Sequence, residues 1–334
     1  MLSSEFIESL WYGKHPLSLL LLPLSWFYQF FMFLRRQGYN LGLLPIKRVN
    51  YPVIVVGNVT VGGTGKTPLV IWLAEYLKQQ NLNPGIVSRG YGGAATRWPQ
   101  QVRPDSDPYM VGDEPVVIAR RTACPVAASP DRYAAAEGLI EYEKCNILIC
   151  DDGLQHHALA RDIEIAVIDS SRRFGNGRCL PAGPLRESLG RLKSVDMVVS
   201  NGKPEHGEYQ MEYILQPLRM LVDEKKQMDI DRLKDQTVHA VAGIGNPAKF
   251  FALLRKHGIN TIEHRFQDHH RYTRRDIEYG DDLPVVMTEK DAVKCIEFAD
   301  SHHWYIPIDV KMGNIFEHRF SMLLKDIIDG QKTA

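Results

Sequence analysis

The chain of 334 residues lacks an excess of either charge and has few cysteines. Lysine plus arginine and aspartate plus glutamate are equal at 40 each, so the net charge does not favour a nucleic acid as partner, and no acidic tail favours disorder. The five cysteines are an odd number without a Cys-x-x-Cys pair, which argues against a disulfide framework and a structural zinc site and predicts a reducing cytosol. No internal repeat or low-complexity tract is present, and the length predicts two domains.

A long uncharged apolar run is present near the amino terminus. It extends from Pro16 to Leu34 and is followed by two arginines. A helix of about 20 residues spans a bilayer, and the Trp-Phe-Tyr cluster in the run suits a membrane interface. We expect a membrane anchor that spans the bilayer or lies in its interface; the alternative is a helix buried on its own domain. The basic residues expected to contact anionic headgroups are Lys14, Arg35, Arg36, Lys47 and Arg48.

A glycine-rich segment, Asn58 to Val70, follows the β-branched apolar run Tyr51 to Gly57 and precedes an apolar pattern of helical spacing. Strand, glycine-rich loop, Gly-Lys-Thr and helix are the context of a phosphate-binding P-loop, although Thr60 stands where the standard motif has its first glycine. The alternative is an ordinary glycine-rich turn. Lys66 is expected to reach the β- and γ-phosphates, and Thr67 to ligate Mg²⁺. The expected nucleotide-binding residues are Thr60, Val61, Gly62, Gly63, Thr64, Gly65, Lys66 and Thr67.

Strand and helix patterns alternate along the rest of the chain. This alternation predicts the α/β class, with a P-loop NTPase-like three-layer α/β/α domain and a second, smaller α/β/α domain whose first strand starts at Val238. Two short apolar runs flank Gln216-Pro217 and predict a hairpin between the domains. In the second domain we expect helices over 247–256, over 273–279 and from Asp291. The expected boundaries are 1–45 for the anchor, 46–207 for the P-loop domain, 208–223 for the two-stranded linker and 224–334 for the C-terminal domain.

Two aspartates end a second apolar strand. Asn146 to Cys150 is followed by Asp151 and Asp152, the form of a Walker B acid that holds Mg²⁺ beside a P-loop. The alternative is a strand-terminating turn. Gln155 follows at once and could touch nucleotide, metal or acceptor, whereas the adjacent histidines His156 and His157 do not have zinc spacing.

A carboxylate for the acceptor hydroxyl is expected at Asp113, in Gly-Asp-Glu-Pro after a long polar segment. Phosphoryl transfer to an alcohol needs a carboxylate or histidine within hydrogen-bond reach of the attacking oxygen. The alternative for Asp113 is a helix N-cap. The segment Phe266 to Tyr272 contains two histidines, and one of them could orient the base or share its proton; the alternative is a polar loop that starts a helix.

Two further motifs have competing interpretations. Gly243 to Ala248 resembles a dinucleotide-binding fingerprint, with Glu263 about 20 residues on, but a short Gly-x-Gly pattern is weak evidence for NAD. Thr288 to Lys294 starts a helix after a strand. Lys290 or Lys294 could meet a phosphate, but a capped and solvated helix start is the favoured interpretation.

Six blocks of sequence occur in a defined order after the P-loop. They are Arg89-Gly-Tyr-Gly, Val111-Gly-Asp-Glu-Pro, Asp151-Asp-Gly-Leu-Gln-His-His, Leu180-Pro-Ala-Gly-Pro-Leu-Arg-Glu, Phe266-Gln-Asp-His-His and Thr288-Glu-Lys-Asp-Ala-Val-Lys. With the hydrophobic amino terminus, they resemble the tetraacyldisaccharide 4′-kinase family of the lipid A pathway over nearly the whole chain. In that family threonine also replaces the first P-loop glycine.

The resemblance implies an enzyme that uses ATP and Mg²⁺ to phosphorylate the 4′-hydroxyl of a tetraacylated glucosamine disaccharide 1-phosphate, giving lipid IVA. It implies two α/β/α lobes at the inner (cytoplasmic) membrane, with the catalytic domains on the cytoplasmic face where ATP is found, and no obligate protein partner. A membrane surface also suits an acceptor with four acyl chains. The alternative hypothesis is a membrane-anchored regulatory P-loop ATPase, which hydrolyses ATP without an alcohol acceptor.

The resemblance also implies residue roles. Lys66 and Thr67 would hold phosphate and Mg²⁺, Asp113 would be the catalytic base, and His269 would pair with it, with His270 as the open alternative. Four residues would serve the metal and the nucleotide, and how metal ligation divides among the three acids stays open: they are Asp151, Asp152 and Glu187 for the metal, and Gln155 for the nucleotide.

Overall fold

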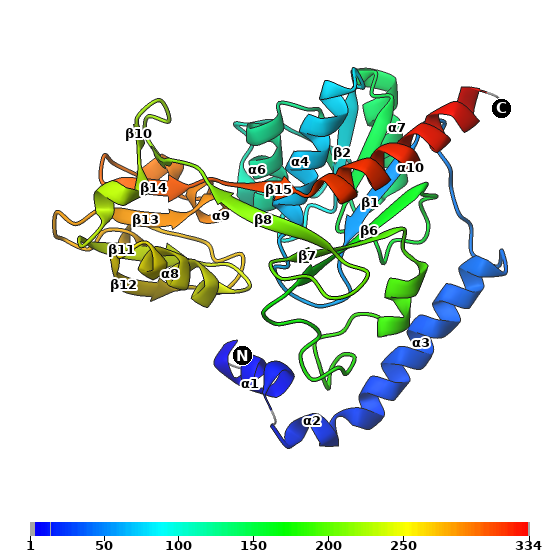
Figure 1. Ribbon diagram of the computed structural model, residues 1–334, viewed down its shortest axis with the longest axis horizontal. Coiled ribbons are helices and arrows are strands. Elements are labelled where there is room, and N and C mark those ends of the chain that lie inside the picture. Colours follow the sequence, from blue (N-terminus) through cyan, green and yellow to red (C-terminus); the bar gives the residue numbers. More distant parts are fainter. Residues whose placement is uncertain (1–3, 14, 333–334) are drawn as a thin grey trace.

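The computed structural model describes residues 4–13 and 15–332 (Figure 1). It contains two α/β lobes, each built on its own sheet, and three N-terminal helices outside both sheets. The expected α/β class is therefore confirmed. Lys14, one of the expected headgroup contacts, lies outside the described residues, as do positions 1–3 and 333–334 of the expected terminal domains.

The larger lobe has a sheet of nine strands in the order β15-β8-β7-β6-β1-β5-β2-β4-β3. Neighbouring strands are parallel except at the two edges, where β3 is antiparallel to β4 and β15 to β8. The strands are β1 (Val53–Gly57), β2 (Pro84–Ser88), β3 (Gln100–Val102), β4 (Val126–Ala128), β5 (Ile147–Asp151), β6 (Ile163–Asp169), β7 (Met197–Asn201), β8 (Tyr209–Leu215) and β15 (Ile308–Met312).

Helices cover both faces of this sheet. Successive side chains of a strand point to opposite faces, so Ile54 and Val56 of β1 belong to one core and Val53 and Val55 to the other. The first core also contains residues of α4, α6 and α10, and the second contains residues of α7. The helices of the lobe are α4 (Lys66–Gln79), α5 (Pro108–Val111), α6 (Asp113–Thr122), α7 (Arg132–Glu143) and α10 (Asn314–Lys332), with a 3₁₀ turn, η1 (Leu189–Ser194).

The smaller lobe has a sheet of six strands in the order β10-β9-β14-β13-β11-β12. Its strands are β9 (Leu218–Met220), β10 (Gln227–Met228), β11 (Thr237–Ala242), β12 (Asn260–Arg265), β13 (Val285–Thr288) and β14 (His303–Ile306). Its helices are α8 (Pro247–Lys256) and α9 (Glu289–Ala292), with 3₁₀ turns η2 (Ile230–Leu233), η3 (Arg274–Asp276) and η4 (Ile296–Phe298). The expected helix over 247–256 is confirmed.

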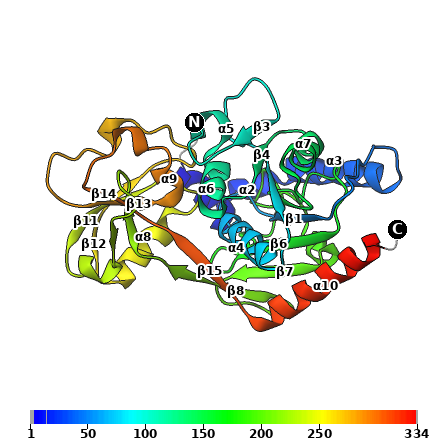
Figure 2. The same cartoon turned by 90° about the horizontal axis from the view of Figure 1, so that it is seen from above.

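The expected hairpin around Gln216-Pro217 is wrong. β8 pairs with β15 in the larger sheet, with Met211 opposite Met312, whereas β9 pairs with β14 in the smaller sheet. Figures 1 and 2 show β8 and β15 side by side between the lobes. The partner of each strand is far away in the sequence, and the local apolar pattern carries no information about it. The chain thus leaves the larger lobe after β8 and returns to it as β15.

Two expected helices of the smaller lobe are shorter than the sequence indicated. The segment 273–279 contains only the 3₁₀ turn η3, in which Thr273 and Asp276 form a capping box. The helix expected from Asp291 is the single turn α9, which starts at Glu289 and is capped by the Thr288 side chain. The first turn of a helix is costly to form, so short polar segments remain single turns unless packing extends them.

The N-terminal helices are α1 (Ser4–Tyr12), α2 (Leu17–Leu20) and α3 (Leu22–Asn40). One side of α3 faces the segment 179–194 of the larger lobe: Ser25 Oγ donates to Cys179 O at 2.8 Å and Tyr28 Oη to Arg186 O at 2.8 Å. The rest of its circumference leaves large apolar side chains exposed, namely Leu24, Trp26, Phe27, Phe30, Phe31, Phe33 and Leu34. Within the described parts of the chain, no helix combines the length and apolar character needed to cross a membrane.

Candidate active site

The P-loop connects β1 to α4, and the Asn58 side chain organises it. Asn58 Nδ2 donates to Thr60 O at 2.8 Å and to Gly62 O at 3.3 Å, and its Oδ1 accepts from Lys66 Nζ at 3.1 Å. Val61 N donates to Pro184 O at 2.8 Å, which fixes the outer side of the loop. Lys66 and Thr67 are the first two residues of α4, so both lie at the positive end of a helix that suits phosphate.

The acidic pair lies at the carboxyl end of β5, beside the P-loop. Asp152 contacts Lys66 Nζ at 3.3 Å and Arg186 Nη1 at 2.9 Å. Burial raises the pKa of Asp152, but the charges of Lys66 and Arg186 outweigh that effect and hold the pKa below its ordinary value. Asp152 is therefore an ionised neighbour of the phosphate-binding lysine.

Asp151 has a different environment. Its side chain is buried, and among the described residues its Oδ1 has no hydrogen-bond partner. Burial raises the pKa of Asp151 to about 7, the charge of Glu114 adds to this effect, and Lys66 opposes it. A buried carboxylate oxygen without a partner fits a divalent cation, because Mg²⁺ prefers oxygen ligands and supplies the missing positive charge.

Gln155 and Glu187 lie next to each other, and Gln155 also contacts the backbone of Asn58. Gln155 Nε2 donates to Glu187 Oε1 at 2.8 Å and to Asn58 O at 3.0 Å. Glu187 also faces Arg191 Nε at 3.7 Å. The expected P-loop, Walker B and Leu-Pro-Ala-Gly-Pro-Leu-Arg-Glu residues thus form one connected cluster.

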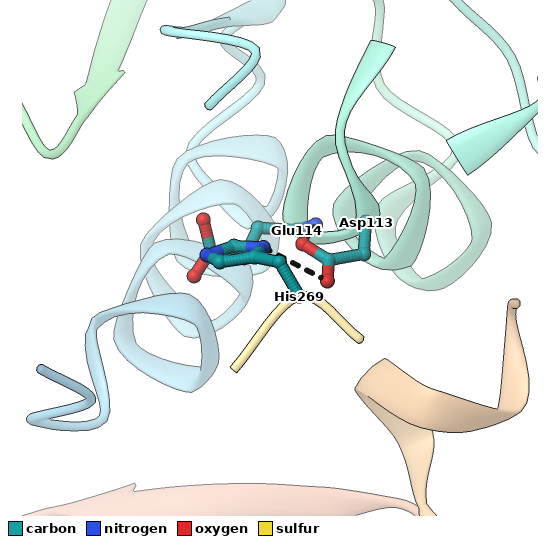
Figure 3. Close-up of side chains that lie close together, drawn as sticks. All are labelled: Asp113, Glu114 and His269. Atoms are coloured by element: carbon teal, nitrogen blue, oxygen red, sulfur yellow. Dashed lines mark hydrogen bonds and ion pairs between the residues drawn. The ribbon is translucent and has the colours of Figure 1, made fainter. Parts of the chain in front are cut away.

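Asp113 is the first residue of α6, and Gly112 is the N-cap, so the N-cap interpretation of Asp113 is wrong. Its carboxylate is 3% exposed. Oδ1 accepts from the backbone N of Glu114 at 2.9 Å, and Oδ2 pairs with His269 Nδ1 at 3.2 Å. Figure 3 shows the carboxylate and the imidazole turned toward each other. His270 instead contacts Asp276, with Nε2 3.5 Å from Oδ2, so His269 is the histidine next to Asp113.

The charges around this pair oppose the effects of burial. Burial raises the pKa of Asp113, but Lys290, His269 and Lys294 outweigh it and hold the pKa well below its ordinary value. Burial lowers the pKa of His269, but the hydrogen bond and charge of Asp113 outweigh it and raise the pKa. The carboxylate is therefore ionised over the whole physiological range.

Asp113, Glu114 and His269 offer ligand atoms within 4.8 Å of one another, a spacing that would suit a metal ion (Figure 3). Lys290 already places a positive charge here. Its Nζ lies 3.1 Å from Glu114 Oε1, 2.9 Å from Asp268 Oδ1 and 3.9 Å from Asp113 Oδ1. We therefore assign no ion to these three residues.

Four site residues were missed from the sequence or given a solvated role: Asn58, Arg186, Lys290 and Lys294. Lys294 Nζ lies 3.5 Å from Asp113 Oδ2, and its side chain is 2% exposed, so the solvated helix start expected there is wrong. The spacing of Lys290 and Lys294 by four residues places them on one side of a helical turn, which was the available signal.

The Gly243 to Ala248 segment lies against the P-loop. A Cβ added to Gly245 would meet Gly63 N at 2.6 Å, so only a glycine permits this approach of two backbones. Arg172 Nη1 donates to Gly245 O at 2.7 Å. The glycine pattern therefore has a structural cause that does not involve a dinucleotide.

Further contacts hold the smaller lobe against the larger one. Arg121, in the last turn of α6, pairs with Glu289 at 2.8 Å, and Tyr272 N donates to Tyr109 Oη at 3.0 Å. The smaller lobe also contributes His269, Lys290 and Lys294, so the site is formed by residues of both lobes.

A family model described as tetraacyldisaccharide-1-P 4′-kinase (LpxK) matches residues 17–327. A tetraacyldisaccharide 4′-kinase of Nitrosococcus oceani is 50% identical over 322 residues, which cover 96% of this chain and 95% of the relative. One of Methylobacillus flagellatus is 49% identical over 328 residues, 98% of each chain. A solved structure, described as an "apo" form of LpxK from Aquifex aeolicus in complex with ATP, has a TM-score of 0.79 at 30% identity and covers 93% of this chain and 99% of its own.

Proposed function

Because this chain belongs to the tetraacyldisaccharide 4′-kinase family, we propose that Asp113 accepts the proton of the acceptor hydroxyl while Lys66 holds the phosphates of ATP. The enzyme transfers a phosphate to the 4′-hydroxyl of the lipid A disaccharide. The observation that carries the residue assignment is the pairing of Asp113 and His269 across the two lobes, next to the P-loop cluster. The comparisons do not favour the alternative of a regulatory P-loop ATPase.

In the proposed reaction, the 4′-hydroxyl gives its proton to Asp113 as its oxygen attacks the γ-phosphorus of ATP. The bond from that phosphorus to the β,γ-bridging oxygen breaks, and ADP leaves. A carboxylate with a low pKa is a weak base. Phosphoryl transfer through a loose transition state depends mainly on positioning and charge, so the orientation of Asp113 by His269 matters more than its basicity.

We further propose that Asp151, Asp152 and Thr67 hold Mg²⁺. The support is the buried Oδ1 of Asp151, which has no hydrogen-bond partner among the described residues. When bound, the ion would neutralise charge on the β- and γ-phosphates. Glu187 is paired with Gln155 and faces Arg191, so we place it around the ion and the nucleotide rather than first among the ligands.

The apolar surface of α3 supports a membrane-associated enzyme. Seven large apolar side chains are exposed on this helix, and an exposed apolar patch of this kind marks an interaction site. We propose that α2 and α3 lie in the interface of the inner membrane, where the acylated acceptor is held, with both lobes on the cytoplasmic face where ATP is available. Arg35 and Arg36 lie within α3, but Arg35 Nη1 donates to Gln155 O at 3.4 Å and Arg36 Nη2 donates to Ser194 Oγ at 3.3 Å. Both side chains therefore face the larger lobe, and we do not include them in the proposed contact with headgroups.

The catalytic assignment is tested with the variant Asp113→Asn in mixed micelles that contain Mg·ATP and the tetraacyl disaccharide 1-phosphate. We expect kcat to fall by about 10²- to 10⁴-fold, because the hydroxyl loses its proton acceptor, while ATP affinity stays nearly unchanged. Mass spectrometry of the lipid follows the gain of one phosphate. The control is Asp105→Asn, an exposed aspartate outside the site. Full activity of Asp113→Asn would show that another group is the base.

A further inference from the structure

A fully buried aspartate, Asp291, holds the glycine loop that touches the P-loop. Its exposure is 0%. Asp291 Oδ2 accepts from Gly243 N at 2.9 Å and from Thr288 Oγ1 at 2.6 Å. Gly243 is two residues before Gly245, whose backbone approaches Gly63 of the P-loop. One oxygen of Asp291 therefore fixes the start of the loop that lies on the nucleotide site.

The other oxygen of Asp291 faces a buried lysine. Asp291 Oδ1 lies 3.0 Å from Lys294 Nζ, and that ammonium group lies 3.5 Å from Asp113 Oδ2. The ring of Tyr272 covers the ammonium at 5.0 Å. Among the described residues, neither Lys294 Nζ nor Asp291 Oδ1 makes a hydrogen bond, so ion pairing is what compensates their burial.

We propose that Lys294 and Asp291 are positioning residues of the transfer reaction. Lys294 holds the carboxylate of Asp113 in the orientation that His269 also supports, and Asp291 joins this contact to the glycine loop on the P-loop. The contacts run without interruption from Asp113 to Gly243, so the orientation of the base and the placement of the loop depend on the same pair of charges. This inference rests on the proposed role of Asp113.

The arrangement predicts different kinetic effects for the two residues. Lys294→Met keeps an unbranched side chain only one atom shorter and removes its charge. We expect kcat to fall about tenfold to a hundredfold, as for a misplaced catalytic group, with little change in the KM for ATP. Asp291→Ala removes both contacts. It should lower kcat and also raise the KM for ATP, because Gly243 loses the acceptor that holds its loop. Both are measured in the micelle assay with Mg·ATP.

A double variant separates positioning from stability. Removing one member of a buried ion pair leaves a charge without a partner, whereas Lys294→Met with Asp291→Asn removes both charges. We expect the thermal midpoint of the double variant to return toward that of the unchanged protein while kcat stays low. A kcat that recovers together with the midpoint would show a purely structural pair and overturn the inference, as would full kcat in Lys294→Met.

Two further variants complete the experiment. Arg173→Met removes a cation from a partly buried pair with Glu208 in the larger lobe, away from Asp113, and should leave kcat unchanged. Asp113→Asn in the same assay distinguishes the two proposals. If it is active, the base assignment fails and this inference fails with it; if it is inactive while Lys294→Met is fully active, only this inference fails.

Discussion

Gly65 ends the P-loop in a conformation that other residues rarely adopt. Its φ is +88°, and an added Cβ would meet Tyr213 Oη at 2.2 Å and Asn201 Nδ2 at 2.8 Å. We expect Gly65→Ala to cost about 1 to 3 kcal/mol of stability through backbone strain. The same strain should weaken ATP binding about tenfold, because the amides that cradle the phosphates shift. Calorimetric titration with ATP and thermal unfolding measure the two effects.

Gly138→Ala, in α7 and outside the P-loop, is the control for Gly65→Ala. Its φ is not positive, and an added Cβ there would meet nothing within 4 Å. It should therefore bind ATP with an affinity close to that of the unchanged protein. If both variants bind ATP equally well, the contact of Gly65 with Tyr213 does not set the shape of the loop.

The pairing of Asp113 with His269 predicts a pH dependence of stability. The lowered pKa of Asp113 stabilises the fold above the ordinary aspartate value, and this part is lost as the pH falls through the folded pKa. The raised pKa of His269 stabilises the fold below the ordinary histidine value, and this part is lost as the pH rises through the folded pKa. Both parts are therefore present between about pH 4 and pH 6.5.

The variant His269→Asn keeps a donor near the Nδ1 position but does not titrate. The stability difference between the unchanged protein and this variant should be largest between about pH 4 and pH 6.5 and should shrink as the pH rises further. Thermal unfolding in a series of buffers gives the difference. A gap that widens toward alkaline pH would mean that His269 does not pair as a cation with Asp113.

The sequence predicted those site residues whose geometry is local. Lys66 follows its loop directly, and Asp151 ends an apolar strand, so each place follows from a few neighbouring residues. Asp113 and His269 are 156 positions apart, and the motif resemblance, not spacing, suggested their pairing. Lys294 has no such local signature. It becomes a buried neighbour of Asp113 only because the two lobes pack together. The short charged segment around Lys294 gives no sign of that packing in the sequence.

At the scale of elements, α10 belongs to the core of the larger lobe. Phe316 and Phe320 are buried, and their rings meet Trp72 and Tyr76 of α4 at centroid distances of 5.6 and 5.5 Å. Phe320→Ala should lower the free energy of unfolding by about 3 to 5 kcal/mol, because it removes a fully buried ring from a packed face. Urea unfolding measures the loss.

Met322 provides the control within the same helix. It is 47% exposed, so Met322→Ala should change stability by no more than about 0.5 kcal/mol. Similar losses for Phe320→Ala and Met322→Ala would mean that α10 does not pack in solution as it does in this structure.

Element type was predictable where the pattern was long and apolar, and connectivity was not. The nearly continuous apolar runs of β1, β5, β6 and β7 indicated buried strands, because both faces of a parallel sheet are covered. The sequence predicted that β8 pairs with β9, because β9 follows it directly and strands adjacent in the sequence often pair. In the structure β8 pairs with β15 instead. Pro217 lies where the chain passes from the larger sheet to the smaller one. The sequence pattern alone could not distinguish a hairpin turn at this proline from a connection between two sheets.

At the scale of the whole molecule, the exposed side of α3 predicts binding to lipid surfaces. Phe27, Phe31 and Leu34 are 72%, 61% and 50% exposed. Replacing all three with serine should weaken binding to anionic phospholipid vesicles strongly, because each large apolar side chain contributes about 1.5 to 3 kcal/mol when fully buried. ATP binding should not change, because these residues do not touch the P-loop cluster. Flotation with vesicles measures the effect.

The control replaces two exposed apolar residues of α10, Ile315 and Met322, with serine. Vesicle binding should be retained, since both residues belong to α10, a helix of the larger lobe that is separate from α3 (Figure 1). If this variant loses binding to the same extent, general surface hydrophobicity rather than α3 would account for the attachment.

Because the chain returns to the larger lobe only at its C-terminal end, the parts of this lobe become available at different times during translation. β15 and α10 follow the whole smaller lobe in the chain, yet they complete the sheet edge and cover α4, the helix that begins with Lys66. While a ribosome is still translating the smaller lobe, α4 lacks this cover, whereas α2 and α3 have already emerged. Because domains fold as units during translation, the helices that we propose to contact lipid become available before the nucleotide site is finished. If α2 and α3 bind lipid as proposed, attachment of the nascent chain would therefore precede its ability to consume ATP.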